Sequence, residues 1–330
     1  MLIRRRKSLW VTSLTSRTKD STLRLIPSSK PKRRTTALPG QVRIGISGWT
    51  YKPWRGVFYP VGLAHKKELA YAASLFPSNE INGTFYSLQR PSSFAAWAEQ
   101  TPPNFVFAIK GSRYITHMLR LRAIEQPLAN FFASGLLTLG PKLGPILWQF
   151  PPNFQFKPDL LEGFFALLPR DTHTAATLAE RHDRRLKGRA YTEPGKRRPI
   201  RHAMEIRHPT FVVPEFISLL RRYNIALVCA DTVEWPRLMD VTSDFLYCRL
   251  HGSKVLYTSQ YSLQELDQWA ARIAAWANGQ EVSDGDRGSP KPARTRSTRD
   301  VFVYFDNDAK VFAPGDAQAL AQRVDKLLAR

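Results

Sequence analysis

The chain has 330 residues, 43% of them hydrophobic, and a formal net charge of +22. This length suits one large α/β barrel or two ordinary domains, and the hydrophobic content is sufficient for a buried core. No apolar run approaches the ~18 residues that span a bilayer, and no secretory apolar segment follows the basic start, so we expect a soluble, cytoplasmic protein.

The positive charge is concentrated in three stretches. Residues 1–41 hold eleven Lys or Arg against one acidic residue, residues 170–201 hold ten against four, and residues 280–300 hold five against four. The rest of the chain carries a net charge of only about +5. The overall charge therefore does not by itself indicate a nucleic-acid-binding fold.

Residues 1–41 lack a sustained apolar period and are rich in Ser and Thr, which predicts a disordered basic tail. An Arg-rich, acid-poor N-terminus is also typical of organelle transit peptides, and this alternative stays open. Nucleic acid is a further candidate partner of such a tail.

Eight short β-type runs follow, separated by intervals long enough for helices. The runs are 42–47, 78–82, 105–110, 144–150, 201–206, 225–230, 245–250 and 301–307. Stretches with apolar residues near i, i+3 and i+4 lie between them, at 66–76, 92–100, 127–139, 160–168, 213–223 and 262–277. This alternation predicts an α/β fold, a (β/α)₈ TIM-barrel-like parallel barrel formed as a single domain by residues 42–330. A doubly wound open sheet is the structural alternative.

Two segments interrupt the alternation, at about 170–200 and 278–299. Both have little apolar period, so we interpret them as surface insertions. Each follows a predicted helix and would emerge from the face opposite the βα loops, where residues contribute to stability more than to chemistry.

Two predicted strands end with charged residues spaced by two. Glu205 and Arg207 end one, and Arg249 and His251 end another. Because side chains alternate along a strand, each pair faces one side while its apolar neighbours face the other. Buried strands tolerate such charges only beside a polar cavity, which predicts a functional pocket at these strand ends.

Polar and aromatic residues follow the other predicted strands at the same end, and in a barrel this end forms one mouth. We take Glu205, His251 and Lys110 as candidate catalytic residues. The candidate ligand-binding residues are Trp49, Tyr51, Glu80, Asn82, Tyr86, Gln149, Arg207, His208, Asp231, Arg249 and Asn307.

The candidate catalytic residues each have a structural alternative. Glu205 could exchange protons in a partly desolvated mouth, or could form an internal ion pair with Arg249 or Arg207. His251 could transfer protons or cap its strand by donating to a backbone carbonyl. Lys110 could bind an anion, act as a base or pair with Glu80.

Metal and cofactor motifs are weak or missing. Glu205, His208, Asp231 and His251 offer suitable donor atoms, but the sequence contains no HExxH, paired CxxC or EF-hand pattern, and no glycine-rich nucleotide loop. We therefore predict no metal and no cofactor. Cys229 and Cys248 lie in apolar strands and are interpreted as buried thiols.

Seven motifs in order resemble the domain of unknown function 72, the YecE-like family. They are GISGWTYKPWRGVFYP (45–60), EINGTFY (80–86), FAIKGSRYITH (107–117), LGPILWQFPPNF (143–154), EIRHPTF (205–211), YCRLHG (247–252) and YFDNDAKVFAPGDAQAL (304–320). The resemblance runs from about Val42 to Leu328, is interrupted by the two insertions, and implies a TIM-barrel-like fold without supplying a reaction. The last motif reads FDND where the family more often has two asparagines after the aromatic residue, which puts Asp306 beside Asn307.

The preferred functional hypothesis is a metal-independent acid/base enzyme that acts on a small anionic or sugar-like substrate in the barrel mouth. In it, Glu205 and His251 exchange protons while Arg207, Arg249 and Lys110 hold the anion. Two alternatives stay open. One is a nucleic-acid-binding or DNA-repair-associated barrel, and the other is a ligand-binding protein without catalysis. The sequence does not define the oligomeric state.

Overall fold

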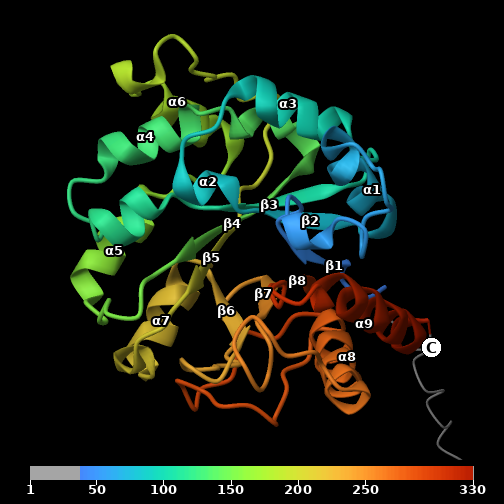
Figure 1. The fold of residues 1–330 in the computed structure, drawn as a ribbon. Helices are drawn as coiled ribbons and strands as arrows, with labels where there is room; N and C mark the ends of the chain where they lie inside the picture. The colour runs from blue at the N-terminus through green and yellow to red at the C-terminus, as the bar shows by residue number, and fades with distance from the viewer. Residues whose placement is uncertain (1–37, 330) are drawn as a thin grey trace, which may run out of the picture. The chain divides into compact units, whose positions relative to one another are not determined.

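The computed structural model describes residues 38–329, which form a closed barrel of eight parallel strands in the order β1 to β8 (Figure 1). The strands are β1 Val42–Ser47, β2 Ser78–Ile81, β3 Val106–Lys110, β4 Leu143–Gln149, β5 His202–Glu205, β6 Ala226–Asp231, β7 Phe245–Leu250 and β8 Asp300–Phe305. The predicted TIM-barrel-like fold is confirmed, and each strand lies within two residues of its predicted bounds.

Helices surround the barrel, as Figure 1 shows. They are α1 Glu68–Leu75, α2 Gly83–Tyr86, α3 Pro91–Glu99, α4 Glu125–Ala133, α5 Pro158–Leu167, α6 Thr172–Ala179, α7 Pro214–Arg222, α8 Leu263–Ala277 and α9 Phe312–Leu328. A π-helical turn, Tyr114–Met118, lies between β3 and α4. Within the described part of the chain, no helix is both long enough and apolar enough to cross a membrane.

Side chains alternate between the barrel interior and the surrounding helices. Ala203, Val228 and Tyr247 belong to one apolar cluster, whereas Met204, Cys229 and Cys248 belong to the clusters that include helix residues. The parallel register pairs Gln149 with Glu205 and Ala230 with Arg249. It therefore carries Glu205 and Arg249 into the interior at the carboxyl ends of their strands, as the spacing of two predicted.

The insertion at 170–200 is partly helical, which the sequence analysis did not predict. Its helix α6 begins with a reciprocal cap, in which the Asp171 side chain accepts the N–H groups of His173 and Thr174. Small buried residues of α6 pack beside α4. Too few large apolar residues are present to give a clear helical period, so the capping residues and the spacing of Ala175, Ala176 and Ala179 were the available signal.

The course of this insertion also differs from the expectation. Its ends are close together near the start of β5, where Thr172 and Arg198 exchange hydrogen bonds. Its middle follows α4, where the Asp183 N–H donates to Asn130 and Gln126 donates to the Arg181 carbonyl. The insertion therefore does not stay at the face of the barrel where it begins and ends, but also contacts residues of α4.

The second insertion lies against the connection between β6 and β7. The Asp240 carboxylate accepts the N–H groups of Gly288 (2.7 Å) and Ser289 (3.1 Å), and Met239 donates to the Asp286 carbonyl. These bonds join the insertion to the loop that carries Trp235, which lies beside the barrel mouth.

The expectations for residues 1–37 fall outside the described residues, including the disordered tail, the transit peptide and the contact with nucleic acid. The last residues of the predicted tail differ from the expectation. The Gly40 N–H donates to the Ala277 carbonyl and the Gln41 N–H donates to Asp300, so the chain is ordered before β1 begins.

Candidate active site at the barrel mouth

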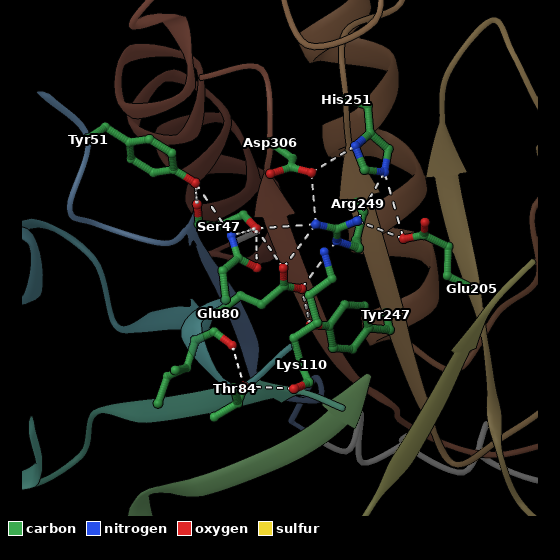
Figure 2. Close-up of polar contacts among 12 residues, drawn as sticks. Ser47, Tyr51, Glu80, Thr84, Lys110, Glu205, Tyr247, Arg249, His251 and Asp306 are labelled. Atoms are coloured by element: carbon green, nitrogen blue, oxygen red, sulfur yellow. Dashed lines mark hydrogen bonds and ion pairs between the residues drawn. The ribbon is translucent and has the colours of Figure 1, made fainter. Parts of the chain in front are cut away.

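Arg249 lies at the centre of an ionic network in the barrel mouth (Figure 2). Its side chain is fully buried, and its guanidinium group donates to Glu205 (2.8 Å), Asp306 (2.8 Å) and both carboxylate oxygens of Glu80 (3.0 and 3.2 Å). Burial opposes the charge, but the three carboxylates raise the pKa of Arg249 well above its usual value. Arg249 is therefore a fixed cation that joins β2, β5, β7 and the end of β8.

Glu205 binds two arginines, so the ion pairs considered as its structural alternative are both formed. One carboxylate oxygen accepts from Arg249, and the other accepts from Nε (2.9 Å) and Nη2 (2.8 Å) of Arg207. Burial alone would raise the pKa of Glu205, but these two cations lower it well below its usual value. Glu205 is consequently a carboxylate at neutral pH and cannot serve there as a proton donor.

Glu80 is held by hydroxyl groups as well as by Arg249. Ser47 Oγ and Tyr247 Oη each donate to it at 2.6 Å. Ser47 comes from β1 and Tyr247 lies two residues before Arg249 on the same face of β7. Every oxygen of this buried carboxylate therefore has at least two partners, which fixes its orientation toward Arg249.

His251 lies between two carboxylates. Its Nδ1 is 3.1 Å from Asp306 Oδ2, and its Nε2 is 3.8 Å from Glu205 Oε2. Burial would raise the pKa of Asp306, but Arg249 and His251 hold it below its usual value. The imidazole ring is covered edge-on by Trp235 and Tyr257. The structure thus places His251 beside the charged groups rather than in the alternative role of capping its strand.

Lys110 differs from the other charged residues of the mouth. Its Nζ lies 4.6 Å from the centroid of the Phe85 ring, and across residues 38–329 its ammonium group forms no ion pair or hydrogen bond, Glu80 included. Burial and the charge of Arg249 lower its pKa, while Glu80, Asp306 and Glu205 oppose this shift. Figure 2 shows its side chain extending toward the network from the end of β3.

His117 is a second titratable group on this side of the mouth, and the sequence analysis did not single it out. Burial, Arg207 and Lys110 lower its pKa to about 4, so the ring is neutral at pH 7. It lies edge-on to the Phe85 ring at 5.1 Å, and its Nδ1 is 2.8 Å from Thr116 Oγ1.

The predicted aromatic residues form part of the rim. A cavity of about 440 Å³ is lined by Trp49, Tyr51, Asn82 and Tyr86, and by six further residues: Gly48, Thr50, Ile81, Gly83, Gln89 and Trp97. Tyr51 donates to the Ser47 carbonyl (2.6 Å), and the Asn82 amide donates to Ser47 Oγ (3.1 Å). Burial and the negative charge of Asp306 raise the pKa of Tyr51, which keeps it a hydroxyl donor. This cavity adjoins the ionic network through Ser47.

Three other predicted ligand-binding residues take part in local structure, and a fourth, Gln149, does not. Asp231 binds Arg237 (2.7 Å) and the Trp269 indole N–H (3.2 Å) on the outer side of β6. Asn307 donates to Asp316 of α9, and His208 accepts the Thr210 N–H. Gln149 lies next to Glu205 in the register, and its Oε1 is buried without a partner among the described residues.

Of the four donors considered for a metal, only Glu205 and His251 lie close together, at 3.8 Å. Asp231 is engaged by Arg237, and His208 by its own turn. For the part of the chain that the structure describes, no three His, Cys, Asp or Glu side chains are grouped so that they could hold a metal ion.

Asp306 and Tyr247 belong to the network but were not among the predicted site residues. The signal for both was the alternation of side chains, because Tyr247 precedes Arg249 by two and Asp306 follows the interior residue Tyr304 by two. Trp235 was also missed, since it lies in a loop. The Arg207 guanidinium lies 4.0 Å from the centroid of its ring, and periodicity in the sequence does not predict this contact.

An eight-stranded parallel barrel with a buried ionic network at the carboxyl ends of its strands defines a protein of the TIM-barrel class. A family model described as "Protein of unknown function DUF72" matches residues 43–329. The chain belongs to this family, which confirms the resemblance drawn from its motifs.

Known relatives support the same assignment. The chain is 30% identical over 121 residues to the UPF0759 protein YunF of Bacillus subtilis and 29% identical over 113 residues to the UPF0759 protein YecE of Escherichia coli. These matches cover 35% and 34% of this chain, and the chain spans only 42% and 39% of the two relatives.

Two solved structures share the fold. A DUF72 family protein from Thermotoga maritima has a TM-score of 0.64 at 23% identity, covering 86% of this chain and 99% of its own. A DUF72 family protein from Enterococcus faecalis has a TM-score of 0.60 at 18% identity, covering 88% and 96%. At these identities the likeness concerns the fold alone.

Proposed function

We propose that the barrel mouth is the active site of an enzyme that performs acid/base chemistry on a small anionic or sugar-like substrate without a metal. The observation that carries this proposal is Lys110, whose amine has a lowered pKa and no ion pair within residues 38–329, beside a network in which the other charges are paired. Perturbed ionisable groups in a polar barrel mouth are characteristic of catalytic sites.

Lys110 has the chemistry of a proton acceptor. A lowered pKa increases the fraction of neutral amine at working pH, and only the neutral amine carries a lone pair that can remove a proton. The Nζ atom lies over Phe85, whose ring shields it from water on one side. Because none of the described residues accepts a hydrogen bond from it, the amine is able to move toward a substrate.

The other catalytic candidates have supporting roles in this proposal. In this proposal His251 exchanges a proton with the substrate; its Nδ1 lies 3.1 Å from Asp306, and its Nε2 lies 3.4 Å from Arg249 and 3.8 Å from Glu205. Glu205 and Arg249 act as positioning residues. All the donors of Arg249 that face the mouth are engaged by carboxylates and Ser47, so we no longer assign it to the substrate anion.

The rim cavity supports a sugar-like substrate. Its volume of about 440 Å³ lies within the range of small-molecule sites, and it combines the Trp49 and Tyr86 rings with the Asn82 amide. Aromatic faces pack against the apolar side of a sugar ring, while amide and hydroxyl groups bind its hydroxyls.

Replacing Lys110 by Met tests the proposal because it separates catalysis from stability. Methionine can fill the space over Phe85 without burying an amine. We therefore expect the free energy of unfolding of K110M to equal or exceed that of the wild type. Monosaccharides, sugar phosphates and small carboxylic acids are incubated with the protein and followed by proton NMR. We expect conversion by the wild type and none by K110M.

K157M is the matched control, because Lys157 is exposed and lies outside the network. It should retain both stability and conversion. If K110M instead loses stability while Lys110 proves protonated at neutral pH, the lysine balances the three carboxylates structurally and the proposal is wrong. Binding of a compound by the wild type without any conversion would favour the ligand-binding alternative.

A further inference from the structure

A second cavity of about 380 Å³ lies on the rim beside the π-helical turn, and the residues around it are donors and cations. It is lined by Tyr86, Ser112, Arg113, Tyr114, Asn130 and Arg185, with Ser87 and apolar residues completing its wall. Of the residues that the structure describes, no acidic side chain lines it. We propose that this cavity binds an organic anion, in which a phosphate or carboxylate group is attached to a flat ring.

Asn130 provides a buried donor for the anion. Asn130 is only 2% exposed, and its Oδ1 accepts the Asp183 N–H at 2.9 Å. This bond identifies Oδ1 as the acceptor, so Nδ2 is the atom on the opposite side of the amide group. Among the described residues, nothing accepts a hydrogen bond from that Nδ2. Because Asn130 lines the cavity, this amide nitrogen is available to donate to a ligand oxygen.

Ser112 adds a second donor of the same kind. It is 7% exposed, and its Oγ accepts the Tyr114 N–H at 3.2 Å, while its hydroxyl donates to no residue between 38 and 329. Ser112 follows Lys110 by two residues, so it lies near the outer edge of the proposed active site.

Two arginines supply the positive charge. The Arg113 guanidinium lies 5.2 Å from the centroid of the Tyr86 ring, and the Arg185 guanidinium lies 5.9 Å from that of Tyr114. Arg185 forms one loose ion pair, with 3.7 Å between its Nε and Asp183. Stacking of this kind orients a guanidinium while leaving its N–H edge available for carboxylate or phosphate oxygens.

The same geometry favours a ring on the ligand. Tyr86 is 64% exposed although it is a large aromatic residue, and Met118, Ile115 and Leu88 continue the apolar wall. An aromatic ring seated against Tyr86 would place its anionic substituent among Arg113, Arg185 and the two buried donors.

Arg185 comes from the insertion at 170–200, which the chain carries between the family motifs. The insertion follows α4 and brings its short 3₁₀ helix, Arg184–Leu186, to the cavity. The inferred site is therefore completed by a segment that interrupts the family pattern. It concerns binding and does not depend on whether the mouth is catalytic.

Isothermal titration calorimetry of the full chain with phenyl phosphate tests the inference. We expect saturable binding by the wild type, and a Kd at least about tenfold higher in R113Q/R185Q because charge-assisted bonds are lost. S112A should weaken binding to a smaller extent. The control R294Q/R296Q removes the same charge from two exposed arginines elsewhere and should bind as the wild type does.

Two further probes separate the parts of the ligand. Inorganic phosphate and phenol should each bind more weakly than phenyl phosphate, since each lacks one of the two features. The inference is overturned if the wild type shows no saturable binding up to about 10 mM, a concentration at which even weak specific sites fill. It is also overturned if R113Q/R185Q, confirmed as folded by circular dichroism, binds like the control, or if phenol binds as tightly as phenyl phosphate.

Discussion

Replacing Glu205 by Gln should cost substantial stability, because this carboxylate is bound on both sides by arginine. It accepts from Arg249 at 2.8 Å and from two nitrogens of Arg207 at 2.8 and 2.9 Å. A glutamine retains one oxygen acceptor, but its NH₂ group would face guanidinium N–H groups. Removing one partner from a buried ion pair costs about 3–5 kcal/mol.

The retained partners of Arg249 reduce this cost. Glu80 and Asp306 continue to neutralise Arg249 in E205Q, and Arg207 is 11% exposed and can reach water. We therefore expect a loss of about 3 kcal/mol in the free energy of unfolding at pH 7, at the low end of that range. Urea denaturation followed by tryptophan fluorescence measures it.

The control and the pH dependence make this expectation specific. E162Q removes a carboxylate that pairs with Arg222 at 2.7 Å on the surface, with 43% and 64% exposed side chains, and should cost less than about 1 kcal/mol. Because the folded pKa of Glu205 is lowered, its stabilisation is present above its usual pKa of 4.5 and is lost as the pH falls. A difference between E205Q and wild type below about 0.5 kcal/mol at pH 7 would refute the reasoning.

Three further substitutions probe the mouth, each measured by urea denaturation. Burial and the charge of Asp306 raise the pKa of Asp308 to about 6, so its ionisation lowers the free energy of unfolding as the pH rises from about 4 to 6. We expect D308N to stabilise the protein above pH 6 by on the order of 1–3 kcal/mol and to have no effect near pH 3. Gly252 has φ +102°, and an added Cβ would lie 2.8 Å from the Val255 carbonyl, so G252A should cost about 1–3 kcal/mol, whereas G163A, with open space around its Cβ, should not destabilise. R207K should lower the free energy of unfolding by about 1–2 kcal/mol, because lysine cannot reproduce the bidentate bond to Glu205 or the stacking on Trp235. An unchanged stability would show that these contacts are not maintained in solution.

The barrel and the direction of its interior charges could be predicted from sequence because both depend on local periodicity. Eight apolar runs at helix-length intervals specify the strands, and the spacing of two between Arg249 and His251 specifies which face they share. The same rule applied to β8 would have selected Asp306 instead of Asn307. Asn307 attracted attention as an amide at a strand end, but it turns outward and binds Asp316.

The partners of the charges could not be predicted, because they depend on how the closed barrel brings distant strands together. Sequence reasoning assigned Arg249 to a substrate anion and paired Lys110 with Glu80 as its structural alternative. In the structure, Glu80 is used by Arg249 and two hydroxyl groups, which leaves Lys110 without a carboxylate. Periodicity in the sequence does not predict which side chains of distant strands are close enough to pair.

The distribution of pairing within the mouth is the strongest argument that it serves a reaction. In a purely structural network each polar group taken out of water is expected to have a hydrogen-bonding partner, because an unpaired one costs free energy on folding. Arg249, Glu205 and Asp306 follow that rule, yet the fold leaves Lys110 over an aromatic ring with a lowered pKa. Ser112, two residues further on, accepts the Tyr114 N–H, but its hydroxyl donates to none of the described residues. The proposed function depends on this difference between Lys110 and the paired charges around it among residues 38–329.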